Sequence, residues 1–102
     1  LTPLRTIRTL FNLWNEYIVG INGNKPAKSF NQTERGLVRY KYCRRKKFWS
    51  AVEKLMKTGL TSYVAITRME AVYARNNATM YQTLIRIGKD KNLTLYNQAT
   101  FH

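Results

Sequence analysis

The fold is decided by one basic, aromatic stretch of the chain, Arg39-Tyr-Lys-Tyr-Cys-Arg-Arg-Lys-Lys-Phe-Trp-Ser-Ala-Val-Glu-Lys-Leu-Met-Lys57. Its apolar residues recur at intervals of three and four, which predicts one face of an α-helix. We place this helix at residues 34–57, with Asn31 or Thr33 as its cap and Gly59 at its end, although a glycine near its start lowers the helix propensity there. The anchoring face consists of Val38, Tyr42, Phe48, Trp49, Val52, Leu55 and Met56.

The opposite face of the same helix is charged. At about 100° per residue, Lys41 and Arg45 fall on the inner side, where their long stems either carry the charge back to solvent or face a groove beside a neighbouring helix. The remaining cations point away from the anchoring face. This charged face holds Arg39, Arg44, Lys46, Lys47, Lys54 and Lys57, with Tyr40, Cys43 and Ser50 among them.

Positive charge dominates the whole chain. The 102 residues include 18 basic and 5 acidic ones, which gives a net charge of +13. Residues 35–57 alone hold nine basic residues and one acidic residue, a net charge of +8. This excess is far beyond what solubility requires. It predicts a polyanionic partner: nucleic acid, an anionic membrane surface or an acidic protein.

Composition and length exclude several classes of protein. A hydrophobic fraction of 44%, with 13% aromatic residues, is too apolar for a disordered tail, and the length suits one domain over residues 1–102. No apolar run is long enough to span a membrane, and no secretory signal is visible. One cysteine, Cys43, and one histidine, His102, exclude a disulfide framework and the usual zinc sites. Because the chain begins at Leu1 rather than at methionine, we expect it to be part of a longer protein.

An enzyme is not expected. The five carboxylates are scattered, no pair of them suggests a general acid and base, and no glycine-rich phosphate loop occurs. A tyrosine nucleophile stays open, because seven tyrosines are present. We therefore expect no cofactor, no metal and no small-molecule ligand.

The segment before the basic helix is predicted to contain one amphipathic helix and a turn. The helix covers residues 6–19 and ends at Gly20, where a positive φ is favoured. A loop follows at residues 20–26, and Pro26 starts a short helix that runs to about Phe30, a core residue. The expected inner residues of the first helix are Ile7, Leu10, Phe11, Trp14, Tyr17 and Ile18.

Two more helices are predicted after the basic helix. Thr61 caps the first, at residues 62–74, and an Asn-Asn pair ends it. The second covers residues 79–87 and is stopped by Gly88, and the last ten residues read as an extended or fraying tail. The expected inner residues are Val64, Ala65, Met69, Val72, Tyr73, Met80, Tyr81, Leu84 and Ile85. The predicted fold is all-α: a compact bundle of about four to five helices with one long basic helix.

Four consecutive cations between aromatic residues indicate a helix that binds nucleic acid. An α-helix fits the major groove of B-DNA, where Arg44 or Arg45 can hold a guanine edge through two hydrogen bonds while lysines hold phosphates. The alternatives for this run are a solvated face or a nuclear localisation signal. The candidate DNA-binding residues are Arg39, Tyr40, Lys41, Arg44, Arg45, Lys46, Lys47, Lys54, Thr61 and Ser62, the last two because a helix N-terminus favours phosphate. Arg5 and Arg8 are weaker phosphate candidates, and we expect Tyr42 to lie in the core.

Three motifs follow one another along the chain: Trp14-Asn-Glu-Tyr-Ile-Val-Gly20, Asn22-Gly-Asn-Lys-Pro26 and Tyr42-Cys-Arg-Arg-Lys46. In this order they resemble the fungal DNA-binding domain of the yeast glycolytic-gene transcriptional activator family, which has osmotic-stress and filamentation regulators as relatives. The resemblance covers about residues 6–56. Family members carry a Leu-rich short helix and a Trp-Arg pair between the proline and the basic helix, where this chain is shorter and has only Phe30.

The resemblance implies a sequence-specific transcription-factor domain of the nucleus, an activator in glycolysis, near the C-terminus of a longer protein. It implies a short CTTCC-type element as the target. In the family reading, Trp14, Tyr17 and Pro26 shape the scaffold, and Arg44, Arg45 and Lys46 face the DNA. The expected partners are double-stranded DNA, transcription co-regulators and a second copy of the chain as a homodimer, with no membrane.

The residues alone leave three functions open. The first is sequence-specific binding of duplex DNA, and the second is architectural or chromosomal binding of nucleic acid without sequence choice. The third is a protein-interaction or membrane-surface module that uses the basic helix. Competition between cognate and scrambled duplexes separates the first two, and retention on anionic vesicles but not on duplex DNA would indicate the third.

Overall fold

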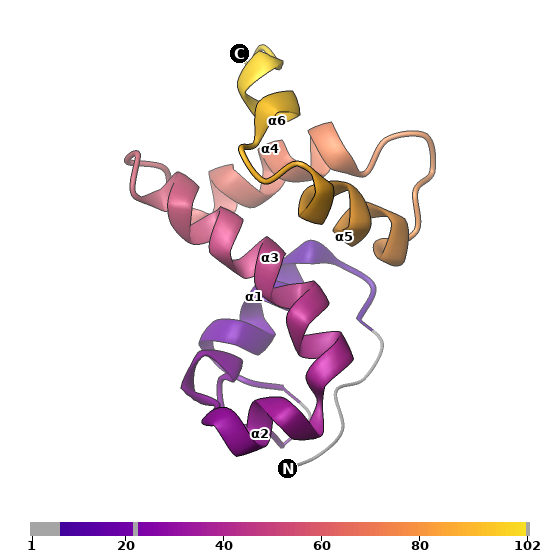
Figure 1. Ribbon diagram of the computed structural model, residues 1–102. Helices are drawn as coiled ribbons and strands as arrows, with labels where there is room; N and C mark the ends of the chain where they lie inside the picture. The colour runs from indigo at the N-terminus through magenta and orange to yellow at the C-terminus, as the bar shows by residue number, and fades with distance from the viewer. Residues whose placement is uncertain (1–6, 22, 102) are drawn as a thin grey trace.

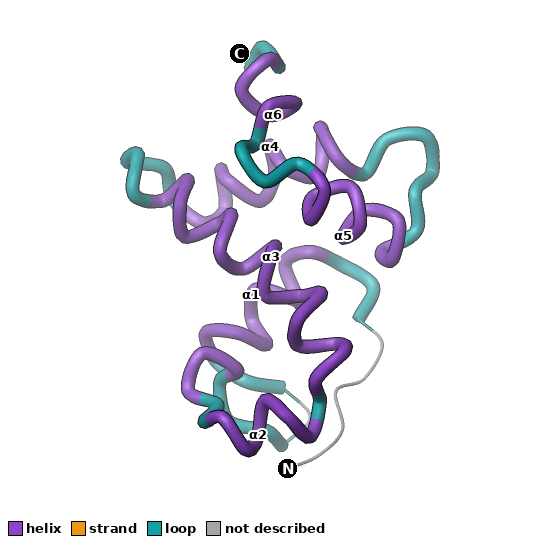
Figure 2. The backbone as a smooth tube through the Cα atoms, in the orientation of Figure 1, coloured by secondary structure: helices purple, strands orange, loops and turns teal. Residues whose placement is uncertain are grey.

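Helix α3 (Arg39–Met56) is the longest element and runs diagonally through the centre of the structure (Figure 1). A computed structural model describes residues 7–21 and 23–101, and this part of the chain contains helices and loops but no strand (Figure 2). The prediction of an all-α bundle around one long basic helix is confirmed. The other elements are α1 (Leu10–Ile18), the 3-10 helix η1 (Ala27–Ser29), α2 (Gln32–Leu37), α4 (Ser62–Tyr73), α5 (Met80–Lys89) and α6 (Thr94–Gln98).

Helix α1 begins later than the periodicity of the sequence predicts. The Thr9 hydroxyl accepts a hydrogen bond from the backbone N–H of Asn12 and so caps the helix at Leu10. Ile7 is buried outside the helix. The predicted end at Gly20 is confirmed: its φ is +89°, and a Cβ there would overlap the backbone of residues 24–26.

The single helix predicted at residues 34–57 is wrong, because the structure has two helices that meet at Val38. The φ and ψ of Val38 are −123° and 30°, so the helical path is interrupted there. Asn31 and Glu34 form a reciprocal capping box that starts α2 two residues early. Gly36 weakens helix continuity next to the interruption. Helix α3 can therefore take its own direction into the core, and its chain leaves through Gly59, whose φ is +105°.

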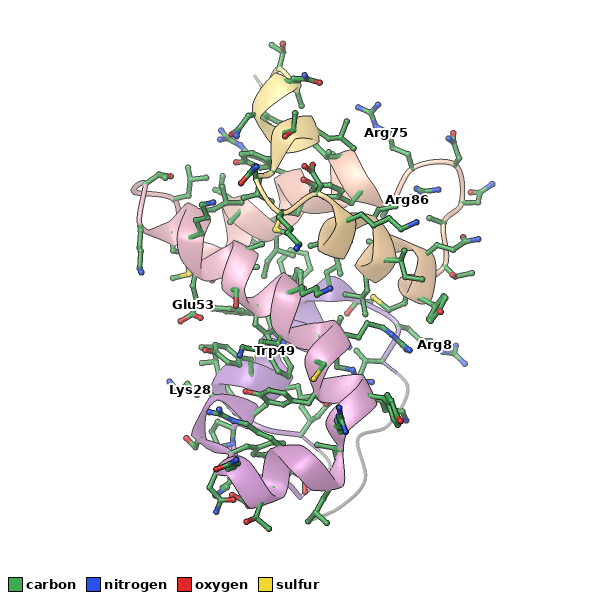
Figure 3. All side chains as sticks on the ribbon, in the orientation of Figure 1. Arg8, Lys28, Trp49, Glu53, Arg75 and Arg86 are labelled. Atoms are coloured by element: carbon green, nitrogen blue, oxygen red, sulfur yellow. The ribbon has the colours of Figure 1, made fainter. Side chains whose placement is uncertain are left out.

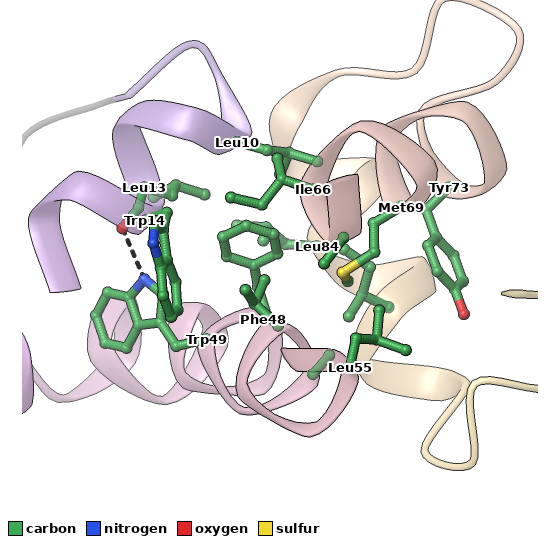
Figure 4. Packing of buried hydrophobic residues seen from close by; sticks show 14 of the residues in the cluster. Leu10, Leu13, Trp14, Phe48, Trp49, Leu55, Ile66, Met69, Tyr73 and Leu84 are labelled. Carbon is green, nitrogen blue, oxygen red and sulfur yellow. Dashed lines mark hydrogen bonds between the residues drawn. The ribbon is translucent and has the colours of Figure 1, made fainter. Parts of the chain in front are cut away.

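The core lies along the inner face of α3 (Figure 4). Phe48, Trp49 and Val52 are at most 1% exposed, and full burial of each such side chain contributes about 1.5–3 kcal/mol. The indole Nε1–H of Trp49 donates to the carbonyl of Leu13 at 2.8 Å and so joins α3 to α1. Figure 4 also shows Leu10, Ile66, Met69, Tyr73 and Leu84 in this cluster. The prediction that Tyr42 belongs to the core is confirmed, whereas the complete burial of Leu13 and Ile66 was not predicted.

The helices after α3 differ from prediction in their ends. Thr61 caps α4 as predicted, since its hydroxyl accepts from the N–H of Val64 at 3.2 Å. Helix α5 is not stopped by Gly88 but continues to Lys89, because Gly88 is buried against α3 instead of ending the helix. Its inward residues are consequently Thr83, Leu84, Ile87 and Gly88, while Tyr81, predicted to face inward, is 55% exposed.

The last residues form a helix rather than an extended or fraying tail. The carboxylate of Asp90 accepts hydrogen bonds from the N–H groups of Thr94 and Leu95, and so satisfies the start of α6. Tyr96 and Leu93 are buried against the rest of the molecule. A local cap and two buried side chains thus give helical order to a segment with weak periodicity in its sequence.

Candidate nucleic-acid interface

The outer face of α3 presents a row of exposed side chains. Arg39, Lys46, Lys47 and Lys54 are exposed, and no acidic side chain within the described ranges lies within 4.0 Å of their charged groups. Tyr40 on the same face is 81% exposed. We call these five residues the outer basic face. It combines uncompensated charge with a backbone held rigid by the buried side of the same helix.

Arg45 does not belong to this face. Its guanidinium Nη1 donates to both carboxylate oxygens of Glu16, at 2.8 and 2.7 Å, and both side chains are buried. The expectation that Arg45 faces DNA is therefore corrected. The physical reason is its position on the inner side of the helix, where α1 places a carboxylate opposite it.

Burial dominates the electrostatics of this internal pair. It raises the pKa of Glu16 above its ordinary value, and the hydrogen bond and charge of Arg45 only partly offset that effect. The charge of Lys41 acts on the same carboxyl group, although Lys41 itself is exposed. Glu16 is a structural residue that the sequence analysis missed. Two features of the sequence could have indicated this pair: an acidic residue within the first amphipathic helix, and a cation on the inner side of the basic helix that needs a partner of opposite charge.

Arg44 lies at the border between α3 and α5. Its guanidinium carbon is 4.5 Å from the centre of the Tyr81 ring, the geometry of a cation–π contact. Arg44 is half-buried, in contrast to the buried Arg45 next to it. Two consecutive arginines therefore have opposite surroundings: one is an internal ion-pair partner, and the other is held at the surface.

Lys47 crosses α5 at a notch formed by Gly88. A Cβ at Gly88 would lie 2.9 Å from the Lys47 Cδ atom, so any other residue would force the flexible lysine stem to shift. Beside this crossing lies an open pocket of about 310 Å³. Its lining combines an apolar floor with lysines at the rim: Lys46, Lys47, Ser50, Ala51, Lys54, Ile87, Gly88, Asp90, Lys91 and Leu93.

The helix-start candidates lie beyond the C-terminal end of α3. Thr61 is exposed and Ser62 is half-buried. The hydroxyl of Thr61 is occupied by the capping bond to Val64, which explains this threonine without a ligand. The structure therefore does not bring these two residues together with the Arg39 and Arg44 end of the basic helix.

Acidic side chains are mostly engaged inside the molecule. Glu53 accepts from the Tyr17 hydroxyl at 2.9 Å, and burial together with this bond raises the pKa of Tyr17 to about 12. Glu34 pairs with Lys25 at 2.6 Å. Asp90 accepts from the Tyr73 hydroxyl at 2.8 Å in addition to capping α6. In the described part of the chain, none of these three carboxylates forms an ion pair with a cation of the outer basic face.

Cations elsewhere on the molecule also have local roles. Arg86 donates to the backbone carbonyls of Tyr73 and Arg75, both at 3.0 Å, and Arg75 donates to the carbonyl of Ala71. Figure 3 shows Arg75 and Arg86 near the α4–α5 loop, with Lys28 in another part of the molecule. These charges add to the positive field without forming a second row on one element. Arg8 is exposed beside α1, and Arg5 lies outside the described residues.

The described residues thus form an all-α domain that buries the apolar side of one long basic helix. The sequence model of a family described as "transcriptional activator of glycolytic enzymes" matches residues 3–72. The chain belongs to this family, as its motifs indicate, and the family is one of transcriptional activators rather than of enzymes. No curated protein and no solved structure matches the chain.

The family match ends inside α4 and does not include α5 or α6. The two contacts that hold Arg44 and Lys47 thus come from outside the matched segment. In the described part of the chain, no helix has both the length and the apolar character to cross a membrane. The same part of the chain has no group of three or more His, Cys, Asp or Glu side chains placed to hold a metal ion.

Proposed function

We propose that this chain is a sequence-specific DNA-binding domain of a transcriptional activator, and that the outer basic face of α3 enters the major groove of duplex DNA. The observation that carries the proposal is the division of α3 into two faces. Its inner face is fixed by Trp49 and by the Arg45–Glu16 pair, while its outer face carries four exposed cations. A rigid helix with charge on one side fits a groove about 12 Å wide.

The cations divide into one base reader and several phosphate contacts. Arg44 is the base reader, because arginine can donate two hydrogen bonds to the O6 and N7 atoms of a guanine. Arg39, Lys46, Lys47 and Lys54 hold phosphates and set the register of the helix on the duplex. We leave Arg45, Thr61 and Ser62 out of the contact set for the reasons given above, and we keep Lys41, which is exposed, as a further candidate phosphate contact.

The family resemblance supplies the first target to test, a CTTCC-type element. Its complementary strand reads GGAAG, and the two adjacent guanines offer the edges that an arginine reads. The proposal also places the protein in the nucleus and treats residues 1–102 as one domain of a longer protein. Co-regulators and a second copy of the chain are further partners under this proposal.

The proposal is tested by binding-site selection from random duplexes, followed by competition between the selected and scrambled duplexes. We expect Arg44→Ala to lower the ratio of cognate to scrambled affinity by about five- to 150-fold, the equivalent of about 1–3 kcal/mol. The matched control is Lys28→Ala, which removes the same charge from an exposed position on η1. It should leave the ratio unchanged. If Arg44→Ala weakens both duplexes equally, Arg44 is a phosphate contact and not a reader.

The second candidate function is architectural binding without sequence choice. The observation that favours it is the positive charge spread over the rest of the surface, which would hold phosphates of any sequence. Equal affinity of the wild-type domain for selected and scrambled duplexes would establish this function and exclude the first.

A further inference from the structure

Tyr81 is an exposed aromatic residue on α5, outside the segment that matches the family. Its ring lies under the guanidinium of Arg44, and it is 55% exposed, so the fold gains little from burying it. The other side of α5 is firmly packed: Leu84 and Ile87 are buried, and Thr79 and Gln82 form a capping box at its start. The ring is thus carried by an element that cannot move freely relative to α3.

The geometry of a stacked arginine makes this contact useful for recognition. When a guanidinium lies parallel to an aromatic ring, the ring covers its flat face and the N–H donors point outward in its plane. Stacking therefore fixes the direction of the side chain without using the donors that a base edge requires. An arginine held in this way loses less conformational freedom on binding than an arginine with a free side chain.

We propose that Tyr81 is a specificity-determining positioning residue that orients Arg44 for a guanine edge. This inference rests on the proposed DNA binding by α3. Two helices then contribute to recognition: α3 carries Arg44, which contacts the base, and α5 carries Tyr81, which orients Arg44. Tyr81 itself does not have to touch the DNA.

The experiment compares Tyr81→Phe with Tyr81→Leu by competition between selected and scrambled duplexes. Phenylalanine keeps the ring and removes only the hydroxyl, so Tyr81→Phe should keep the wild-type ratio. Leucine keeps apolar bulk but has no ring face, so we expect the ratio to fall by about two- to fivefold with little change in affinity for the scrambled duplex. In an Arg44→Ala background, Tyr81→Leu should cause no further loss of the ratio.

A readout without DNA checks the contact itself. The side-chain Nε–H resonance of Arg44 should be displaced by the ring current of Tyr81 in the wild type and in Tyr81→Phe. In Tyr81→Leu it should return toward the position of a free arginine, while the backbone spectrum and the unfolding midpoint stay unchanged. A merely structural role for Tyr81 would change the midpoint and not the ratio.

The outcomes separate this inference from the function on which it rests. If the wild type binds selected and scrambled duplexes equally, the proposed function is overturned, and the role of Tyr81 is overturned with it. If the wild type discriminates and Tyr81→Leu discriminates equally well, only the role of Tyr81 is overturned. A loss of ratio that persists in the Arg44→Ala background would also overturn it, because Tyr81 would then act through another residue.

Discussion

The two sides of α3 are held by different means. On the α1 side, the helix is fixed by the buried Arg45–Glu16 ion pair and by the hydrogen bond from the Trp49 indole. The guanidinium of Arg45 is therefore engaged inside the domain. On the α5 side, Arg44 lies over the Tyr81 ring and the Lys47 stem crosses Gly88, and of these two cations Lys47 is exposed and Arg44 is half-buried. The comparison shows that one side fixes the position of the helix through buried contacts, while the contacts on the other side involve cations that we propose bind DNA.

The largest expected effect on stability comes from removing the ion pair between α1 and α3. Glu16→Ala leaves the buried guanidinium of Arg45 without its carboxylate, and we expect a loss of about 3–5 kcal/mol in the free energy of unfolding. Urea denaturation measures this loss. A double variant, Glu16→Leu with Arg45→Met, removes both charges and should recover most of the stability.

The same double variant also tests whether Arg45 contacts DNA. If Arg45 has only a structural role, the refolded double variant should discriminate between selected and scrambled duplexes as the wild type does. A loss of discrimination in a stable double variant would instead return Arg45 to the DNA contacts, as the family resemblance implied.

A smaller effect is expected from Asp90, the carboxylate that joins α5 to α6. Asp90→Ala removes the acceptor of two backbone N–H groups and of the Tyr73 hydroxyl, and should cost about 0.5–2 kcal/mol. Urea denaturation at neutral pH measures the cost, and Asp90→Asn, which keeps one acceptor oxygen, should lose less. An unchanged midpoint in Asp90→Ala would show that α6 does not depend on this cap.

The lowered pKa of Asp90 also predicts a pH dependence of stability. Burial alone would raise the pKa of Asp90, but its hydrogen bonds from Leu95, Tyr73 and Thr94 outweigh this effect and lower it. Its contribution to stability is therefore complete above its ordinary pKa of 3.8 and is lost as the pH falls through the lower folded value. Unfolding curves of Asp90→Asn between pH 2 and 5 should lack the acid-side loss.

The smallest effect is expected at the Gly88 notch. Gly88→Ala gains about 0.5–1 kcal/mol of helix propensity but forces the Lys47 stem to shift, so we expect a change in stability below about 1 kcal/mol. The displaced lysine should weaken its phosphate contact and lower the slope of log affinity against log salt by up to about 0.9.

Gly36→Ala is the matched control for the notch, because Gly36 is also helical and a Cβ there would meet open space. It should gain helix propensity without changing the salt slope. Identical slopes for Gly88→Ala and the wild type would show that Lys47 does not need the notch.

Local patterns in the sequence predicted much of the fold. The spacing of Phe48, Trp49 and Val52 predicted the anchoring face, and glycines at positions 20 and 59 predicted where two helices end. The cap at Thr61 was predicted as well. These features depend on a few neighbouring residues, so periodicity and capping chemistry are sufficient to find them. The same patterns failed at Gly88, because whether a glycine ends a helix or makes room for a neighbour depends on what packs against it.

The sequence by itself determined that a long helix carries an apolar side and a dense row of cations, since both follow from residue type and helical spacing. Helical spacing also placed Arg45 on the inner side of this helix and Arg44 on its charged face, but only the tertiary structure decided which side chains these two arginines contact. Arg44 and Arg45 have the same chemistry, and their roles differ because α1 places Glu16 beside one and α5 places Tyr81 beside the other. These partners lie 29 and 37 residues away along the chain. A contact over such a separation depends on how the helices pack, which local sequence patterns do not encode.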